Sequence, residues 1–133
     1  MPASGKVLVD TSAWITFFRK LDPCYSKVLQ WLSEDRIVMA GIVLAELMQG
    51  VKSDREMSVL KDFKHIFPFL PESPLLWESA GLLSYRLRRK GITVGLSDCL
   101  IAVSAQEADA SLYTLDTHFG RIKEEAGISL LAE

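Results

Sequence analysis

The sequence contains few cysteines and histidines, and this scarcity excludes several classes of protein. Two of its 133 residues are cysteine and two are histidine. Cys24 and Cys99 are too few for a disulfide scaffold and lack the spacing of a metal site. Two histidines do not build a zinc site by themselves. We therefore expect reduced thiols, with Cys99 buried in the most apolar segment of the chain.

Long apolar runs are also missing from the sequence. The longest covers residues 37–48, and these 12 residues include Glu46. A helix that spans a bilayer needs about 20 predominantly apolar residues. The first apolar run, residues 7–9, is too short for the core of a signal peptide. We therefore expect a cytoplasmic protein that does not enter a membrane.

The charge balance excludes a protein that simply coats nucleic acid. Lysine and arginine number 15 against 17 acidic residues, which gives a net charge of −2. If four acids bind a metal, 15 basic and 13 acidic residues remain, a balance of +2. Local basic patches still allow a nucleic-acid substrate, although solvated helix faces explain each basic residue equally well. Two such patches are Lys52, Arg55, Lys61 and Lys64, and Arg86, Arg88, Arg89 and Lys90.

The length and the hydrophobic pattern predict one α/β domain. A chain of 133 residues can bury somewhat over ~65% of its unfolded surface. Short apolar runs alternate with segments of helical periodicity, which is typical of a mainly parallel sheet. We expect strands over residues 6–9, 37–40, 111–115 and 128–131, a short edge strand within 68–74, and helices over 11–19, 25–33, 41–48, 53–65, 75–90, 97–108 and 117–125.

Two serines are expected to begin helices as N-caps. Ser53 precedes one predicted helix, and Glu56, three residues later, would complete a capping box. Ser97 precedes the most apolar predicted helix.

Four carboxylates lie in apolar surroundings. Asp10 and Asp116 end two of the predicted strands, and Glu46 and Asp98 are expected in the first turns of two helices. An ionised carboxylate is costly to bury unless it is paired, hydrogen-bonded or bound to a metal, and no basic residue is adjacent to any of the four in sequence. Ligands bind at the carboxyl ends of parallel strands, at the point where strand order reverses. The predicted topology can therefore bring all four acids to one edge of the sheet.

A shared divalent cation would account for the four acids at once. Mg²⁺ and Mn²⁺ prefer oxygen ligands, and such an ion activates water and neutralises charge on phosphate esters. Thr11, Ser12 and Thr114 are hydroxyls close to two of the acids and can orient carboxylates or water, although Ser12 also suits a helix cap. The pattern therefore indicates metal-dependent chemistry on phosphate esters.

Each acid also has an ordinary explanation. Asp10 and Asp116 suit helix caps, and Asp98 suits the first turn of a helix, where the macrodipole favours negative charge. Glu46 could belong to a solvated stripe, but no ion-pair partner lies at helical spacing from it. His118 lies two residues from Asp116 and could move a proton, but metal-activated water needs no histidine base. The joint pattern is stronger than any one member.

The motifs around these acids resemble those of a known family. The run Val-Leu-Val-Asp-Thr-Ser-Ala-Trp at 7–14 is similar to the opening of a PIN domain. Glu46, then Leu-Ser-Asp-Cys-Leu-Ile-Ala at 96–102, then Leu-Tyr-Thr-Leu-Asp-Thr-His-Phe at 112–119 follow in the family's order. The match spans nearly the whole chain, which at this length most resembles the VapC-type toxins of bacterial and archaeal toxin–antitoxin pairs.

This resemblance implies a fold, an activity and partners. The fold would be a single PIN domain over residues 1–133, a three-layer α/β/α sandwich with a mainly parallel central sheet. The activity would be that of a Mg²⁺-dependent endoribonuclease, with Mn²⁺ as the alternative metal, which hydrolyses RNA phosphodiester bonds as the toxin of a type II toxin–antitoxin pair. The partners would be RNA, a cognate antitoxin and a second copy in a homodimer, with DNA contacted only through the antitoxin.

The resemblance also implies roles for particular residues. The catalytic and metal-binding acids would be Asp10, Glu46, Asp98 and Asp116, with Asp10 and Asp98 as direct ligands. Many relatives have a basic residue just before the last acid, where this chain has Leu115, so a positive contact to substrate is not expected there. The residues expected to hold the phosphate backbone are Lys52, Arg55, Arg86 and Arg89.

Two other functions are alternatives to that of a toxin. A housekeeping RNA-processing or DNA-directed nuclease would have the same site and no antitoxin. A non-catalytic α/β signalling module would need adjacent acids after the first strand and a lysine after the last, and Val9-Asp10 and residues 128–133 supply neither. A degenerate fold kept only for binding is disfavoured by four intact acids. The sequence leaves open the RNA target, the cleaved bases and the metal.

Overall fold

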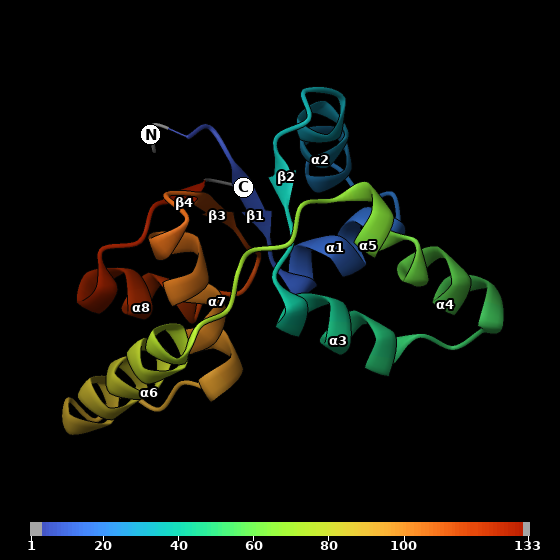
Figure 1. The fold of residues 1–133 in the computed structure, drawn as a ribbon. Coiled ribbons are helices and arrows are strands. Elements are labelled where there is room, and N and C mark those ends of the chain that lie inside the picture. Colours follow the sequence, from blue (N-terminus) through green and yellow to red (C-terminus); the bar gives the residue numbers. More distant parts are fainter. Residues whose placement is uncertain (1–3, 132–133) are drawn as a thin grey trace.

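The computed structural model describes residues 4–131, and within these residues a four-stranded sheet runs through the centre of the molecule (Figure 1). All of its strand pairs are parallel, and the spatial order is β2-β1-β3-β4. Helices flank the sheet, and every residue of its central strands β1 and β3 is buried, including the polar Ser111. The strands are β1 (Val7–Val9), β2 (Ile37–Val38), β3 (Ser111–Tyr113) and β4 (Leu130–Leu131).

The strand order reverses between β1 and β3. From β1 the chain crosses to β2 on one side, and it later returns to β3 on the other side. Leu8 is in register with Val38 on β2 and with Leu112 on β3. Just beyond β1, the backbone N–H of Asp10 donates to the carbonyl of Tyr113 at 2.9 Å. The residues that follow β1 and β3 therefore lie side by side, at the place where parallel sheets bind ligands.

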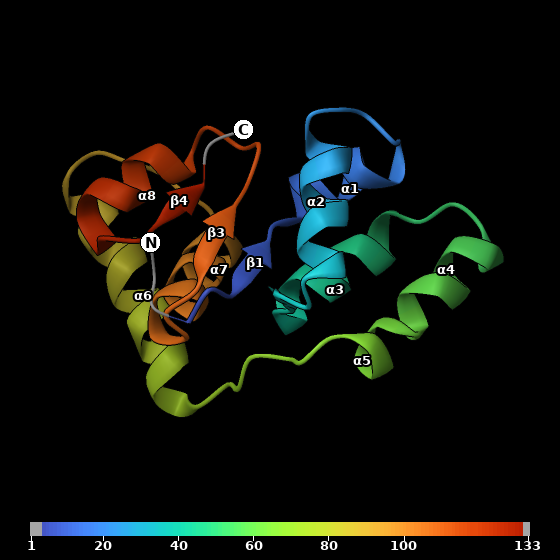
Figure 2. The ribbon, with the colours of Figure 1, turned by 90° about the horizontal axis from the view of Figure 1, so that it is seen from above.

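The helices fall into two groups on either side of the molecule (Figures 1 and 2). One group contains α1 to α5, and the other contains α6, α7 and α8. Helix α7 packs against α6, α8 and β3 and also contacts α3, so it joins the two groups. The bounds are α1 (Thr11–Phe18), α2 (Cys24–Ser33), α3 (Gly41–Gly50), α4 (Asp54–Lys61), α5 (Phe63–Ile66), α6 (Pro74–Arg89), α7 (Leu96–Glu107) and α8 (Phe119–Ala126).

Helix α6 illustrates how local sequence sets an element. Ser73 is its N-cap, and the Ser73 hydroxyl accepts from the backbone N–H of Leu76 at 3.2 Å. Pro74 follows as the first helical residue, where its missing N–H costs nothing. The chain leaves the helix through Gly91 at φ 77°, a conformation that glycine adopts without strain. One apolar stripe faces the core and consists of Leu76, Ala80, Leu83 and Leu87.

The edge strand predicted within residues 68–74 is wrong. This segment forms a single isolated bridge, between Phe69 and Met39, and otherwise runs as an extended connection from α5 to α6. Three prolines in seven residues remove the backbone N–H groups that a longer ladder needs.

The helix predicted over residues 53–65 is divided at Asp62 into α4 and α5. Its N-cap is confirmed, because the Ser53 hydroxyl accepts from the backbone N–H of Glu56 at 3.1 Å. The reciprocal bond of the expected capping box is displaced by one residue: the Glu56 carboxylate accepts from the N–H of Lys52 at 3.4 Å.

The predicted N-cap at Ser97 is wrong. Helix α7 begins at Leu96 with Gly95 as its N-cap. The Gly95 carbonyl already accepts from the backbone N–H groups of Asp98 and Cys99, at 3.1 and 3.2 Å. Ser97 therefore lies inside the first turn rather than before it.

The apolar character of α7 results in deep burial. The side chain of Cys99 is fully buried, as predicted, and burial raises the pKa of its thiol, with a further contribution from Asp98. Within residues 4–131 no helix combines the length and the apolarity that crossing a bilayer requires.

Candidate metal centre

Asp10 is a buried carboxylate held by three hydrogen bonds. It follows β1, caps α1, and has a relative exposure of 4%. Its Oδ1 accepts from the backbone N–H of Thr11 at 2.7 Å. Its Oδ2 accepts from the hydroxyls of Ser12 at 3.0 Å and Thr114 at 2.6 Å. Donors of this kind stabilise the charged form of a carboxylate that has lost most of its water.

Both hydroxyls, those of Ser12 and Thr114, join Asp10 to the loop that carries Asp116. The Ser12 hydroxyl accepts from the backbone N–H of Leu115 at 3.1 Å. The Thr114 hydroxyl accepts from the backbone N–H of Asp116 at 3.0 Å. Each hydroxyl donates to one carboxylate and accepts from the neighbouring loop, so the position of the loop after β3 is tied to that of Asp10.

Glu46 reaches the same region from α3. It lies in the second turn of this helix rather than the predicted first turn, because α3 begins at Gly41, directly after the N-cap Ala40. Its Oε1 accepts from the hydroxyl of Thr11 at 2.8 Å. Thr11 therefore contacts Asp10 through its backbone N–H and Glu46 through its side chain.

Asp98 and Asp116 approach each other from α7 and from the end of β3. Asp98 lies in the first turn of α7, as predicted. The Oδ1 of Asp116 accepts from the backbone N–H of His118 at 2.9 Å. The Nδ1 of the His118 ring lies 3.2 Å from the same oxygen. One possible ligand atom from each of Asp98, Asp116 and His118 lies within 4.8 Å of the others.

Burial and the negative charge of the neighbouring acids raise the pKa of Asp98. Partial burial raises the pKa of Asp98 to about 6, and repulsion from Asp10, Asp116 and Glu46 adds to the effect, while His118 opposes it. The other three predicted acids are thus close enough to act on Asp98. A cation among them would relieve this repulsion, and carboxylate oxygens are the ligands that Mg²⁺ and Mn²⁺ prefer. The donor set fits a divalent cation.

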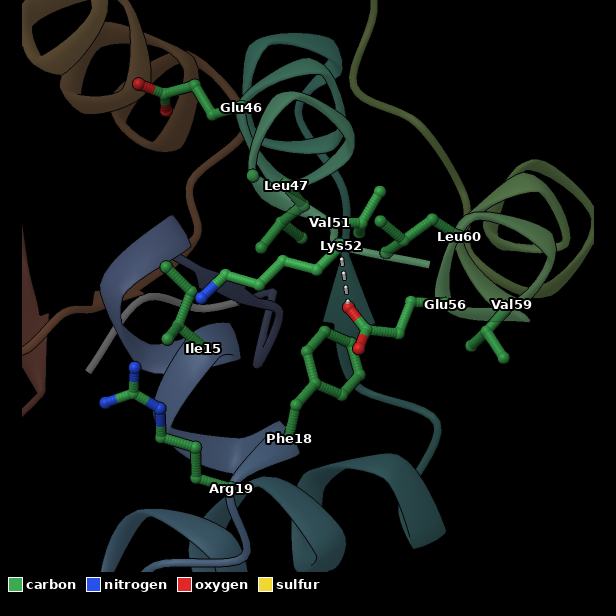
Figure 3. A pocket seen from close by; sticks show the side chains of 11 residues that line it. Ile15, Phe18, Arg19, Glu46, Leu47, Val51, Lys52, Glu56, Val59 and Leu60 are labelled. Atoms are coloured by element: carbon green, nitrogen blue, oxygen red, sulfur yellow. Dashed lines mark hydrogen bonds between the residues drawn. The ribbon is translucent and has the colours of Figure 1, made fainter. Parts of the chain in front are cut away.

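A groove of about 520 Å³ begins beside Glu46 and runs between α1, α3 and α4 (Figure 3). Arg19 and Lys52 line it, and the long side chain of Lys52 extends across it toward α1 (Figure 3). The predicted phosphate contact Lys52 therefore lines the same groove as Glu46, whereas Arg55 is exposed on α4. Most of the remaining wall is apolar and consists of Ile15, Phe18, Leu47, Val51, Val59 and Leu60.

The other two predicted phosphate contacts lie near the C-terminal end of α6. Arg86 lies 3.6 Å from the carboxylate of Glu125, which also pairs with Lys90. Arg89 donates to the hydroxyl of Tyr85 at 3.4 Å and lies over its ring. In this structure Arg86 thus joins α6 to α8 through Glu125.

Sequence reasoning gave too little weight to two residues near the acids. It treated His118 only as a weak candidate for moving a proton, although its position two residues after Asp116 was a usable signal. It did not single out Arg19, whose one sequence signal is its place after the helix that Asp10 caps.

Comparison with known proteins identifies similar sequences. A family model for the PIN domain matches residues 7–125. The chain is 32% identical over 118 residues to Ribonuclease VapC11 from Mycobacterium tuberculosis, covering 85% of this chain and 88% of that protein.

Solved structures with the same fold are also found. A DNA-bound VapBC from Salmonella typhimurium matches with a TM-score of 0.77 and 26% identity, over 95% of this chain and 96% of that one. VapBC2 from Rickettsia felis, bound to a DNA fragment from its promoter, matches with a TM-score of 0.76 and 26% identity, over 94% and 96% of the two chains.

Proposed function

Because this chain belongs to the PIN-domain family and, within it, to the VapC ribonucleases, we propose that it is the metal-dependent, RNA-cleaving toxin of a toxin–antitoxin pair. The observation that carries this proposal is the convergence of four carboxylates from separate parts of the chain. Asp10, Glu46, Asp98 and Asp116 lie close enough for the other three to raise the pKa of Asp98. An arrangement that places like charges together at the ligand-binding edge of a parallel sheet is typical of a functional site.

The four acids are proposed to hold Mg²⁺ or Mn²⁺, with Asp10 and Asp98 as direct ligands. When bound there, such an ion supplies a lowered pKa for coordinated water and neutralises charge that develops on a phosphodiester. Thr11, Ser12 and Thr114 are proposed to fix the carboxylates in their orientation, and their hydrogen bonds to Asp10 and Glu46 support this role.

The substrate is proposed to be RNA held by its phosphate backbone. Lys52 is the strongest candidate contact, because it lines the groove that begins at Glu46. Arg55 is exposed on the next helix and can extend the same positive surface. Arg86 and Arg89 on α6 are proposed as a second patch, for which Arg86 would have to exchange its Glu125 partner for phosphate.

The proposed protein partners are a cognate antitoxin and a second copy of this chain. Two structural neighbours are toxin–antitoxin complexes bound to DNA. This supports an antitoxin partner for the chain, and we propose that the antitoxin, rather than this chain, contacts the DNA. The groove lined by Glu46, with a volume of about 520 Å³ and a mostly apolar wall, offers such a partner a place to bind beside one of the four acids. A segment seated there would cover the site, which is a simple way to inhibit the toxin. Exposed Ile15, Phe18 and Leu21 at α1 favour further protein contacts.

Cleavage of a mixed RNA panel tests the proposal. The purified protein, free of antitoxin, is incubated with Mg²⁺, with Mn²⁺ and with EDTA, beside the variant Asp98→Asn prepared identically. We expect cleavage that requires the metal and that is lost in the variant. Equal cleavage by both proteins would identify a contaminating nuclease.

A second measurement separates a narrow RNA specificity from a wrong assignment. If neither protein cuts the panel, total cellular RNA is sequenced for new 5′ ends after brief expression of each protein. Discrete ends that appear with the wild type and not with Asp98→Asn would support the proposal. Identical RNA ends in both samples would contradict it.

A further inference from the structure

His118 brings an imidazole to the edge of the acidic cluster. One of its ring nitrogens, one oxygen of Asp98 and one oxygen of Asp116 lie within 4.8 Å of one another. The four acids of the predicted site offer only oxygen ligands, so His118 adds a different chemistry to the same place.

The position of His118 is set by the backbone around it. Its N–H donates to Oδ1 of Asp116 at 2.9 Å, and it forms the N-cap of α8. The next residue, Phe119, is fully buried and anchors the start of that helix. The imidazole itself is 65% exposed, with Nδ1 lying 3.2 Å from the same Asp116 oxygen. A fixed backbone and an exposed ring allow the side chain to adjust without disturbing the fold.

The dimensions suit one ion shared by the three groups. Ligand atoms about 2.1 Å from an octahedral ion lie at most about 4.2 Å apart. The observed limit of 4.8 Å is slightly larger, so a small rotation of the side chains brings the three atoms into range. Of these three side chains, the imidazole is the freest to rotate because most of it faces solvent.

We infer that His118 is a ligand of the metal centre and makes this centre bind Mn²⁺ in preference to Mg²⁺. The inference rests on the proposed function, because it concerns the same cation site. Mg²⁺ is a hard ion that takes oxygen ligands and keeps its waters, whereas imidazole binds first-row transition metals. Losing the imidazole therefore weakens binding of Mn²⁺ much more than binding of Mg²⁺. Co²⁺ and Ni²⁺, which bind nitrogen ligands more strongly than Mn²⁺, are expected to depend on His118 still more.

Pulsed electron paramagnetic resonance of bound Mn²⁺ tests the inference directly. The protein is prepared without a histidine tag and with ¹⁵N-labelled histidine, and Mn²⁺ is added below the protein concentration. Since the chain has two histidines, His65→Ala is the matched control for His118→Ala. His65 is exposed on α5. We expect hyperfine coupling to a histidine ¹⁵N in the wild type and in His65→Ala, and its loss in His118→Ala.

Calorimetry gives a second readout that does not depend on cleavage. In His118→Ala the affinity for Mn²⁺ should fall by at least about 10-fold, because removing even a residue that only orients a metal ligand typically costs this much. The affinity for Mg²⁺ should change by less than about threefold, since its oxygen ligands remain. Neither affinity should change in His65→Ala.

The outcomes distinguish this inference from the proposed function. Mn²⁺ that binds the wild type and requires Asp98, but shows no coupling to a histidine nitrogen, would overturn the role of His118 and leave the acidic site intact. Equal losses of Mg²⁺ and Mn²⁺ affinity in His118→Ala would also overturn the inference, because His118 would then act only by positioning Asp116. Failure of the wild type to bind either ion would overturn both proposals.

Discussion

Asp98 and Glu125 are both partly covered carboxylates on helices of the same half of the molecule, but their neighbours carry opposite charges. Glu125 on α8 pairs with Arg86 and Lys90 of α6. Asp98 on α7 faces three further carboxylates, and the pKa of its side chain is raised to about 6. The matched cluster, formed by Glu125, Arg86 and Lys90, joins α6 to α8, and the charge of its carboxylate is balanced without a metal ion. We therefore expect the acidic cluster to lower the stability of the metal-free protein and a bound cation to relieve the repulsion.

The largest difference between the two clusters should appear in activity. Asp98→Asn should lower RNA cleavage in saturating Mg²⁺ or Mn²⁺ by about 10³-fold or more, because several kcal/mol of charge stabilisation by the metal would be lost. Glu125→Gln should leave the rate within about twofold, since its carboxylate holds helices rather than a reacting group. Initial rates on one defined RNA, measured side by side, check this expectation. A comparable loss in both variants would mean that the acidic cluster is not specifically catalytic.

Cation binding should stabilise the protein through the acidic cluster only. At a free metal concentration 100 times its dissociation constant, linkage predicts a gain of about 2.7 kcal/mol in the free energy of unfolding. Thermal melts with and without Mn²⁺ should show this gain in the wild type and in Glu125→Gln, and almost none in Asp98→Asn. A gain that persists in Asp98→Asn would place the cation elsewhere.

The third expectation concerns the metal-free protein and its response to pH. The folded-state pKa of Asp98, about 6, lies above its ordinary value of 3.8, so the folded protein binds this proton more tightly than the unfolded chain does. Through this group the protein gains stability as the pH falls from neutrality. Asp98→Asn should therefore stabilise the metal-free protein by about 1–2 kcal/mol near pH 7, a figure reduced for partial exposure. The advantage should shrink as the pH falls through about 6 and vanish near about 4.

Asp54→Asn is the matched control for this measurement. Asp54 also lies in the first turn of a helix, but its side chain is exposed to solvent. The helix macrodipole favours its charge, so the substitution should cost about 0.3–1 kcal/mol at low salt. Urea unfolding in the presence of EDTA measures both variants. If Asp98→Asn destabilises the metal-free protein as Asp54→Asn does, repulsion among the four acids is not significant.

Much of the site could be predicted because its acidic residues lie within or next to apolar segments of the sequence. Asp10 and Asp116 follow short apolar runs that favour buried strands, and parallel strands bring their carboxyl ends to one edge. The second strand is shorter than predicted, because β3 ends at Tyr113, three residues before Asp116. Asp98 lies in the first turn of α7, a helix in which residues 99–105 are all buried. Glu46 was expected in the first turn of its helix but lies in the second, although the predicted start of that helix at residue 41 agrees with α3.

What the sequence could not predict depended on tertiary contacts. The run of residues 68–74 is apolar enough for a strand, but its prolines allow only the bridge between Phe69 and Met39. The approach of His118 to Asp98 joins residues that are 20 positions apart and exists only once α7 packs beside β3. The groove beside Glu46 likewise requires α1, α3 and α4 to be placed together.

Within the comparison of Asp98 with Glu125, the smallest expected effect is the loss of stability in Glu125→Gln, opposite in sign to the gain in Asp98→Asn. Glu125→Gln removes the shared partner of Arg86 and Lys90, whose side chains are 54% and 61% exposed. Because both cations remain solvated, the loss should be only about 0.5–1 kcal/mol. It should diminish between roughly 0.05 and 1 M salt, where exposed charges are increasingly screened.

Urea unfolding of the metal-free protein at the two salt concentrations gives this value beside that of Asp98→Asn. Removing a carboxylate should thus cost stability where cations surround it and add stability where carboxylates do. If Glu125→Gln stabilised the protein as well, the general excess of acidic charge would explain both results. The acidic cluster would then have no distinct electrostatic character. A destabilising effect that is independent of salt would instead indicate that Glu125 acts by packing between α6 and α8 rather than by its charge.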